Sequence, residues 1–278
     1  MTPLTDFWRS VETLHDVVYF APDVKDRYGA LGLKGYWRGY FASRAAALGT
    51  PSAALVTATF HGFAPAMVGR AVPDVWSLAD RDAVLAERLA VGRDALAGPL
   101  AGHDVDDLAR RLASVADGVD VAGKPLAAAE SALPVPDDTT AALWRHATVL
   151  CELRGDCHVA VLVAAGLDGR LANVLQVAVG RAPANQRELR GWTEQEWTAA
   201  AEDLRSRGWV DADGTATETG RAARARIEDA TDRAVAASLG TEATAHAVAV
   251  TAPLLAAARA VAASGALPFP NPVGLTAP

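Results

Sequence analysis

One stretch near the C-terminal end, residues 192–231, constrains the fold more than any other. Thr193 followed by Glu196 forms a capping box, which marks the start of an amphipathic helix. The Asp-Ala-Asp-Gly turn at 211–214 lies between two short segments with strand character and predicts a β-hairpin. A long helix is expected from about Thr219. The order of elements is therefore helix, hairpin and helix.

This order is typical of a winged helix. Over roughly 171–239 the chain resembles a MarR-type winged-helix domain, because the helix caps and the hairpin follow one another as they do there. A second resemblance rests on four segments spread along the chain: GLKGYWRGYFASRAAALG, VTATFHGFAP, RGDCHVA and GWTEQEW. Through these segments almost the whole chain resembles an actinobacterial family whose members are labelled helix-turn-helix or SalK-like proteins. It implies a helical fold and a bacterial cytoplasmic protein, and it implies no particular activity.

The composition agrees with a helical, cytoplasmic protein. Hydrophobic residues make up 51% of the 278 positions and aromatic residues 6%, which suits packed helices better than a β-sandwich. The net charge of -7 disfavours passive binding to a polyanion, although a local basic patch would still allow it. The N-terminal residues lack the features of a signal peptide, and we expect no membrane-spanning run. We expect a monomer or a homodimer.

The chain matches itself when it is shifted by about 116 positions. Arg38-Gly39 then aligns with Arg154-Gly155, and Trp76-Ser77 aligns with Trp192-Thr193. Chance matches in an alanine-rich chain remain the alternative. A duplication predicts a mostly α protein built from tandem, pseudo-symmetric winged-helix-like halves, with one short β-hairpin wing in the C-terminal half. Each Arg-Gly pair is expected to interrupt a helix.

The expected domain limits follow from the distribution of glycine and proline. Residues 118–138 contain several of both and are the best linker candidate. We therefore expect an N-terminal helical winged-helix-like domain over 1–117 that lacks an evident wing, and a C-terminal winged-helix domain over 139–264. A Pro/Gly-rich tail follows over 265–278. Halves that pack about a pseudo-twofold axis would leave a pocket at their interface.

Ionisable residues around the second Arg-Gly pair have no counterpart in the first copy, which predicts a functional site there. His158 is the candidate acid or base, oriented by Asp156 or Glu152, and Arg38 and Arg154 would hold an anionic group. The competing interpretation is structural, with Arg154 and Asp156 as an ion pair between helices and His158 as a satisfied core residue. The candidate catalytic residues are His158, Asp156, Glu152 and Tyr40, and the candidate ligand-binding residues are Arg38, Arg154, Tyr36, His61 and Thr57.

Aromatic and hydroxyl side chains extend this candidate site into the first copy. Tyr36 and Tyr40 are four positions apart, so they share a helix face that would line a cavity for a flat or cationic ligand. Tyr40 would also serve as a second proton donor. Thr57 lies in an apolar segment, where its hydroxyl would need a partner such as a ligand.

We expect no metal and no cofactor. The acidic residues and histidine near 152–158 do not have the spacing of a known ligand pattern, and no glycine-rich phosphate loop follows a strand. DNA binding is disfavoured but stays open. The expected recognition helix carries Glu194, Glu196, Glu202 and Asp203 against Arg205 and Arg207.

The leading hypothesis is a protein that handles a small organic molecule, by binding or by catalysis, in a pocket between two winged-helix-like halves that have lost DNA reading. The molecule would be anionic if the arginines contact it. The alternative is a MarR-like transcriptional regulator that senses a small effector, with Arg205, Arg207 and the basic residues of 221–226 on the DNA backbone. A scaffold without a ligand is a third hypothesis.

Overall fold

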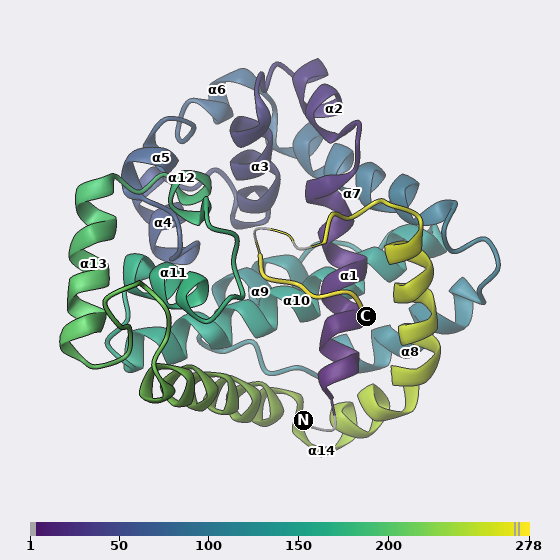
Figure 1. Ribbon diagram of the computed structural model, residues 1–278. Coiled ribbons are helices and arrows are strands. Elements are labelled where there is room, and N and C mark those ends of the chain that lie inside the picture. The colour runs from purple at the N-terminus through teal and green to yellow at the C-terminus, as the bar shows by residue number, and fades with distance from the viewer. Residues whose placement is uncertain (1–3, 270, 272) are drawn as a thin grey trace.

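The computed structural model describes residues 4–269, 271 and 273–278, and its regular structure is helical (Figure 1). The prediction of a mostly α protein is confirmed. In chain order the elements are α1 (Thr5–Phe20), α2 (Val24–Ala30), α3 (Tyr36–Ala45), the 3-10 helix η1 (Ala46–Leu48), α4 (Ala53–Thr59), α5 (Pro65–Gly69), α6 (Val75–Leu78), α7 (Arg81–Ala97), α8 (Val105–Ala116), α9 (Pro125–Ser131), α10 (Thr139–Ala164), α11 (Gly169–Ala178), α12 (Gln186–Arg190), α13 (Glu194–Ser206) and α14 (Glu218–Ala263).

The expected wing is reduced to a single β-bridge. Val210 pairs antiparallel with Ala216 across the predicted turn, and within the described part of the chain this bridge belongs to no longer strand. The capping box that precedes it is confirmed, because the Thr193 side chain accepts the Glu196 N–H and the Glu196 side chain accepts the Thr193 N–H. The α13–α14 connection therefore has the predicted order without a regular hairpin.

Helix α10 occupies the centre of the molecule. It packs against α1, α7, α8, α9 and α14, and in Figure 1 it crosses the middle of the molecule behind α1. Its N-terminus is capped by Asp138, which accepts the N–H of Ala141. Because α10 is covered on several sides, its apolar residues do not form a single stripe, and polar residues of its second half also become buried.

Both predicted helix breaks are wrong. Arg154-Gly155 lies inside α10, and Arg38-Gly39 lies inside α3. An interior glycine costs only about 1 kcal/mol relative to alanine, so tertiary packing readily outweighs it. At Gly39 that packing is evident, because a Cβ atom there would lie 2.8 Å from a ring carbon of Tyr28.

The hydrophobic core crosses the predicted linker. One large cluster contains Phe7 and Trp144 together with Leu254, and it also includes Leu126 of α9, which lies within 118–138. A smaller, separate cluster unites α11, α13 and the bridge; its buried members are Leu162, Leu167, Leu171, Val174, Leu175, Ala178, Ala200, Leu204, Val210, Ala216 and Ile227. The α11–α13 segment thus has its own small core, and the expected domain limits stay a prediction.

Helix α14 consists of two parts separated by a kink. Gly240 has φ of 66°, a left-handed conformation that favours glycine, and the second part matches the helix expected over 241–264. By length and composition alone α14 would be able to cross a membrane. Val250, Leu254 and Val261, however, are fully buried in the large core cluster. Over the apolar window of α14 as a whole, 33% is buried.

His61 and Gly62, which follow α4, pack tightly against α11. In the proposed repeat, α11 corresponds to α4. A Cβ atom at Gly169 would lie 2.0 Å from the carbonyl oxygen of His61, so only glycine fits there. The Asn173 side chain donates to the carbonyl of Gly62 over 2.8 Å. These contacts join the two halves next to the candidate site.

The matched tryptophans differ in their partners. The Trp192 indole donates to the Gly62 carbonyl in the other half over 3.1 Å, whereas the Trp76 indole donates to the Pro51 carbonyl in its own half over 3.0 Å. The halves therefore share an order of elements but not this contact, and the pseudo-symmetry stays a prediction.

Replacing Gly169 by alanine should destabilise the protein by at least about 1–3 kcal/mol, because the new Cβ overlaps a backbone oxygen that cannot move alone. The control is Gly29→Ala in α2, where a Cβ meets no atom within 4 Å and where alanine should stabilise the helix by about 0.5–1 kcal/mol. Urea unfolding of both variants measures the difference. Equal stabilities would contradict the packing of α11 on the segment after α4.

Candidate functional site

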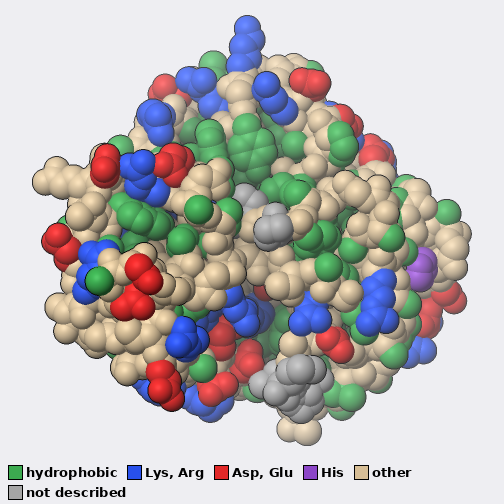
Figure 2. All heavy atoms as spheres, viewed as in Figure 1, with side chains coloured by type: hydrophobic (Ala, Val, Ile, Leu, Met, Phe, Trp, Pro, Cys, Tyr) green, Lys and Arg blue, Asp and Glu red, His purple; other side chains and the backbone are tan. Residues whose placement is uncertain are grey.

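A cleft of about 660 Å³ opens between α1, α10 and the first part of α14. Residues 273–276 of the C-terminal tail form part of its rim. Figure 2 shows Lys and Arg side chains beside Asp and Glu side chains in the lower centre of the viewed face. The ionisable residues that line the cleft are Arg9, Glu12, His15, Asp16, Tyr19, Tyr40, Arg44, Cys151, Glu152, Arg154, His158, Arg181, Arg224, Glu228, Asp229 and Asp232.

Helix α1 contributes a polar face that the sequence analysis missed. Glu12, His15, Asp16 and Tyr19 have the spacing i, i+3, i+4 and i+7, so they share one face, and all of them line the cleft. The sequence pattern of α1 was interpreted only through its apolar, core-facing residues. The regular spacing of polar residues in an otherwise apolar helix was the available signal.

Arg44 and Glu152 form a bidentate ion pair in the floor of the cleft. Arg44 Nε donates to Glu152 Oε1 over 2.9 Å, and Arg44 Nη2 donates to Glu152 Oε2 over 2.8 Å. Burial acts to raise the pKa of Glu152, but the Arg44 guanidinium outweighs burial and lowers it to about 2. Glu152 is therefore a permanent anion held by α3, and its hydrogen bonds do not orient His158.

Arg154 is already neutralised by carboxylates from two helices. Its Nη2 lies 3.0 Å from Glu228 and 3.6 Å from Asp232, and its Nη1 lies 3.8 Å from Glu12. The structural interpretation thus applies to Arg154, although its partners are on α14 and α1 and do not include Asp156. A ligand anion would have to compete with these groups for Arg154.

His158 keeps one ring nitrogen open to the cleft. Its Nδ1 lies 2.9 Å from the Thr231 hydroxyl, which itself donates to the carbonyl of Ile227 over 2.9 Å. Thr231 must therefore accept from Nδ1–H, which leaves the lone pair on Nε2. Within the part of the chain that the structure describes, the hydrogen bond of the ring is the one at Nδ1, and Nε2 has no partner. Burial lowers the pKa of His158 to about 4, so the ring is neutral near pH 7.

Asp156 caps a neighbouring helix. Its Oδ2 accepts the backbone N–H groups of Leu126 and Ala127, at 2.9 and 3.0 Å, in the first turn of α9. Burial raises the pKa of Asp156 to about 6. Asp156 does not orient His158 through these contacts, because both hydrogen bonds of its carboxylate go to α9.

His15 repeats the arrangement of His158 deeper in the cleft. Its Nδ1 lies 3.0 Å from Thr148 Oγ1, and Thr148 donates to the Trp144 carbonyl over 3.0 Å. The same reasoning places the proton of His15 on Nδ1 and the lone pair on Nε2, which lies 3.1 Å from the Tyr19 hydroxyl. Burial lowers the pKa of His15 to about 3.

The cleft continues into a smaller recess of about 230 Å³ that has aromatic walls. Phe60 and Phe63 line it, and His61 and Tyr40 contribute polar atoms. The Arg44 guanidinium lies over the Phe60 ring, 4.5 Å from its centre. Tyr40, Arg44, His158 and Arg181 border both the cleft and the recess; these residues mark where the two spaces meet.

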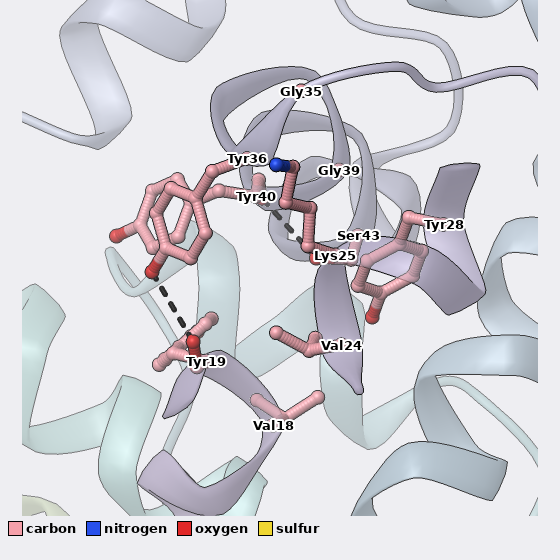
Figure 3. A pocket seen from close by; sticks show the side chains of 10 residues that line it. All are labelled: Val18, Tyr19, Val24, Lys25, Tyr28, Gly35, Tyr36, Gly39, Tyr40 and Ser43. Carbon is pink, nitrogen blue, oxygen red and sulfur yellow. Dashed lines mark hydrogen bonds between the residues drawn. The ribbon is translucent and has the colours of Figure 1, made fainter. Parts of the chain in front are cut away.

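Three predicted ligand-binding residues lie outside the cleft. Tyr36 borders a separate pocket of about 10 Å³, room for roughly one water molecule, and donates to the Tyr19 carbonyl over 3.3 Å (Figure 3). Arg38 donates to the Lys34 carbonyl over 3.5 Å on the exposed side of α3. Thr57 lines a shallow outer hollow. The predicted aromatic cavity is closed because its rings pack on one another.

Glu152→Gln should weaken the dependence of stability on acid pH. The pKa of Glu152 falls from 4.5 to about 2 on folding, so its contribution is fully present above pH 4.5 and is lost as the pH falls through about 2. That loss amounts to about 3 kcal/mol. Urea unfolding between pH 7 and pH 2 should give a shallower decline for Glu152→Gln than for wild type. Exposed Glu202→Gln is the control, and identical slopes for all proteins would contradict the ion pair.

Asp156→Ala should destabilise the protein by about 1–3 kcal/mol, because the first turn of α9 would lose its acceptor. Asp156→Asn keeps a carbonyl oxygen and should lose less. Thermal unfolding of both variants tests the capping role. Variants of equal, wild-type stability would show that the cap contributes nothing.

The chain matches one family model over almost its whole length. The model describes a helix-turn-helix family and covers residues 4–268. Among curated proteins and among solved structures, none matches this chain. The matched segment includes the capped helix α13, the elements around it and the cleft, apart from the rim residues 273–276. The chain therefore belongs to this helix-turn-helix family.

Proposed function

We propose that this protein binds a small organic molecule in the cleft between α1, α10 and α14, and that it no longer reads DNA sequence. The observation that carries the proposal is the open Nε2 of His158 at the junction of the cleft and its aromatic recess. A neutral histidine with a fixed tautomer is a preorganised hydrogen-bond acceptor. If the bound molecule is transformed, His158 is the group that accepts its proton.

Unpaired polar groups around His158 indicate the chemistry of the ligand. Arg181 lines both spaces. Its backbone N–H donates to the Gln176 carbonyl, but its guanidinium forms no hydrogen bond or ion pair within the described residues. Gln176 Oε1 and Arg154 Nε are buried without partners there. An unsatisfied buried group costs about 1–3 kcal/mol, so a ligand that supplies partners gains affinity. These groups fit a small organic anion that also carries a hydrogen-bond donor.

The recess favours an apolar or aromatic part of the same molecule. Phe60 and Phe63 contribute apolar wall to the recess. One face of each ring already carries a guanidinium, Arg44 over Phe60 at 4.5 Å and Arg190 over Phe63 at 4.6 Å from the ring centres. A ligand ring that enters the recess would meet apolar walls while its anionic end stays near Arg181. Apolar walls with a few convergent polar groups are typical of small-molecule sites.

Loss of DNA reading is supported by the surface of α13. Arg207 is paired with Asp203 at 2.6 Å, and Arg205 donates to the Asp211 carbonyl over 3.1 Å. Glu194 and Glu202 are exposed on the same helix. Carboxylates repel phosphates, and cations that are already paired contribute less to DNA affinity.

The proposed basic stripe at 221–226 does not form one surface. Arg224 is buried and pairs with Glu228 in the cleft, whereas Arg226 is exposed. Arg221 donates to the Ala216 carbonyl. The stripe therefore offers fewer phosphate contacts than its sequence suggests.

A transcriptional regulator that senses a small effector is the second candidate, and the helix-turn-helix family favours it. In this case the cleft is the effector site, and α13 contacts DNA. Titration of the protein with its own upstream DNA at low salt separates the two candidates. We expect no sequence-specific binding, whereas tight, salt-dependent binding would establish the regulator.

Protein purified from its own host should retain a small organic anion that native mass spectrometry detects. Binding of that molecule should weaken about 10–100-fold in His158→Ala and in Arg181→Gln, because each removes a polar partner of the ligand. Arg226→Gln, on the exposed side of α14, is the matched control and should bind normally. Wild-type affinity in both cleft variants, with folding confirmed by circular dichroism, would refute the proposed site.

A further inference from the structure

A second cluster in the cleft, distinct from His158, has the composition of a metal site. A ring nitrogen of His15, a carboxylate oxygen of Asp16 and the thiol sulfur of Cys151 all lie within 4.8 Å of one another. The first two residues are on α1 and the third is on α10, so the sequence separation hides the cluster. All three line the cleft of about 660 Å³.

Asp16 is the clearest sign that a partner belongs in this cluster. Asp16 is buried, with a relative exposure of 4% for the residue. Oδ2 has no hydrogen-bond partner within the described part of the chain. A buried carboxylate without a donor is costly, and nearly all such groups in proteins find a partner. A cation bound between Asp16, His15 and Cys151 would supply one.

His15 offers its Nε2 to a metal ion only if a hydroxyl is displaced. Its Nδ1–H contacts the Thr148 hydroxyl at 3.0 Å, and its Nε2 lone pair contacts the Tyr19 hydroxyl at 3.1 Å. A metal ion would take the place of the Tyr19 hydroxyl at Nε2, while Thr148 keeps the ring oriented through Nδ1, which is the usual arrangement around a histidine ligand. The ring also stacks on Trp144, with 16° between the planes.

The surrounding charges allow a dication to enter. Arg88 and Arg44 are the guanidinium groups that act on His15. Glu130 already neutralises Arg88, and Glu152 neutralises Arg44 through a bidentate pair. Ionised Asp16 and Cys151 would together balance a charge of +2. Burial raises the pKa of both groups, so binding has to displace their protons and should strengthen as the pH rises.

We propose that His15, Asp16 and Cys151 bind one divalent transition-metal ion of the Zn²⁺ class, with a fourth coordination position open to the cleft. A set of one nitrogen, one oxygen and one sulfur suits Zn²⁺ and related ions and is unsuited to Mg²⁺ or Ca²⁺, which require oxygen ligands. Tetrahedral coordination needs donor atoms roughly 3.3–3.8 Å apart. The donor atoms of the present cluster lie within 4.8 Å of one another, so they would have to move closer together around a bound ion.

Three protein ligands and one open position are the arrangement of catalytic zinc sites. The open position would face the same space that His158 and Arg181 border. The metal proposal stands without the small-molecule proposal, because the ion binds to protein groups alone. A ligand that coordinates the metal would connect the two.

Titration of the reduced, metal-free full-length protein with Co²⁺ tests the site without any organic ligand. Cobalt bound by a thiolate gives a ligand-to-metal charge-transfer absorption in the near ultraviolet, and tetrahedral cobalt gives strong visible bands. We expect both to saturate at one equivalent of Co²⁺ and to disappear when Zn²⁺ displaces it. Cys151→Ser should abolish the charge-transfer absorption, whereas Cys157→Ser, the matched control, should retain it.

Asp16→Asn provides a test that does not depend on the thiol. It should weaken Co²⁺ affinity by more than about 100-fold, since losing a ligand should cost at least as much as losing a group that orients one. Circular dichroism confirms that each variant is folded. Absence of cobalt absorption in wild type, its survival in Cys151→Ser, or unchanged affinity in Asp16→Asn would each overturn the metal site.

Discussion

The ion pair between Arg44 and Glu152 is the interaction on which the cleft depends. It joins α3, from the N-terminal part of the chain, to the middle of α10, and Glu152 is 1% exposed. Burying either charge alone would be strongly unfavourable, whereas the bidentate pair satisfies both. A second set of ion pairs joins Arg154 of α10 to Glu228 and Asp232 of α14. Helix α10 is thereby fixed from both sides.

Arg44 and Arg154 are paired with carboxylates of the protein. Only a few polar groups of the cleft therefore remain available for other molecules. Burial keeps His15 and His158 neutral, and a threonine whose hydroxyl donates to its own helix sets the tautomer of each ring. Arg181 and Asp16 lack such partners within the described residues. The cleft thus combines a rigid, charge-balanced floor with a small number of unsatisfied groups, as expected of a preorganised binding site.

Local signals in the sequence predicted the local features of the fold. The capping box at Thr193 and Glu196, the helical class and a new helix after Gly240 depend on neighbouring residues, and all are present. The prediction of a helix break at Gly155 was wrong. Glycine disfavours a helix only weakly, and the flanking side chains form hydrogen bonds and ion pairs with other helices. The sequence could not show those partners, since they lie on α9, α1 and α14.

The candidate site was predicted in part. Glu152, Arg154, His158 and Tyr40 do line one cleft, because polar residues concentrated in an apolar helix tend to face a common space. Their roles could not be predicted, since each role is decided by a partner distant in sequence, such as Arg44. The polar face of α1 was visible in the sequence as a spacing, but its position opposite α10 depends on how the helices cross.

A double-mutant cycle between Arg44→Met and Glu152→Gln tests the central claim most directly. Urea unfolding at pH 7 of wild type, both single variants and the double variant gives the coupling energy of the pair. A bidentate pair buried in the cleft floor predicts a coupling of at least about 2 kcal/mol, with each single variant less stable than the double. A coupling near zero, as for an exposed ion pair, would contradict the account.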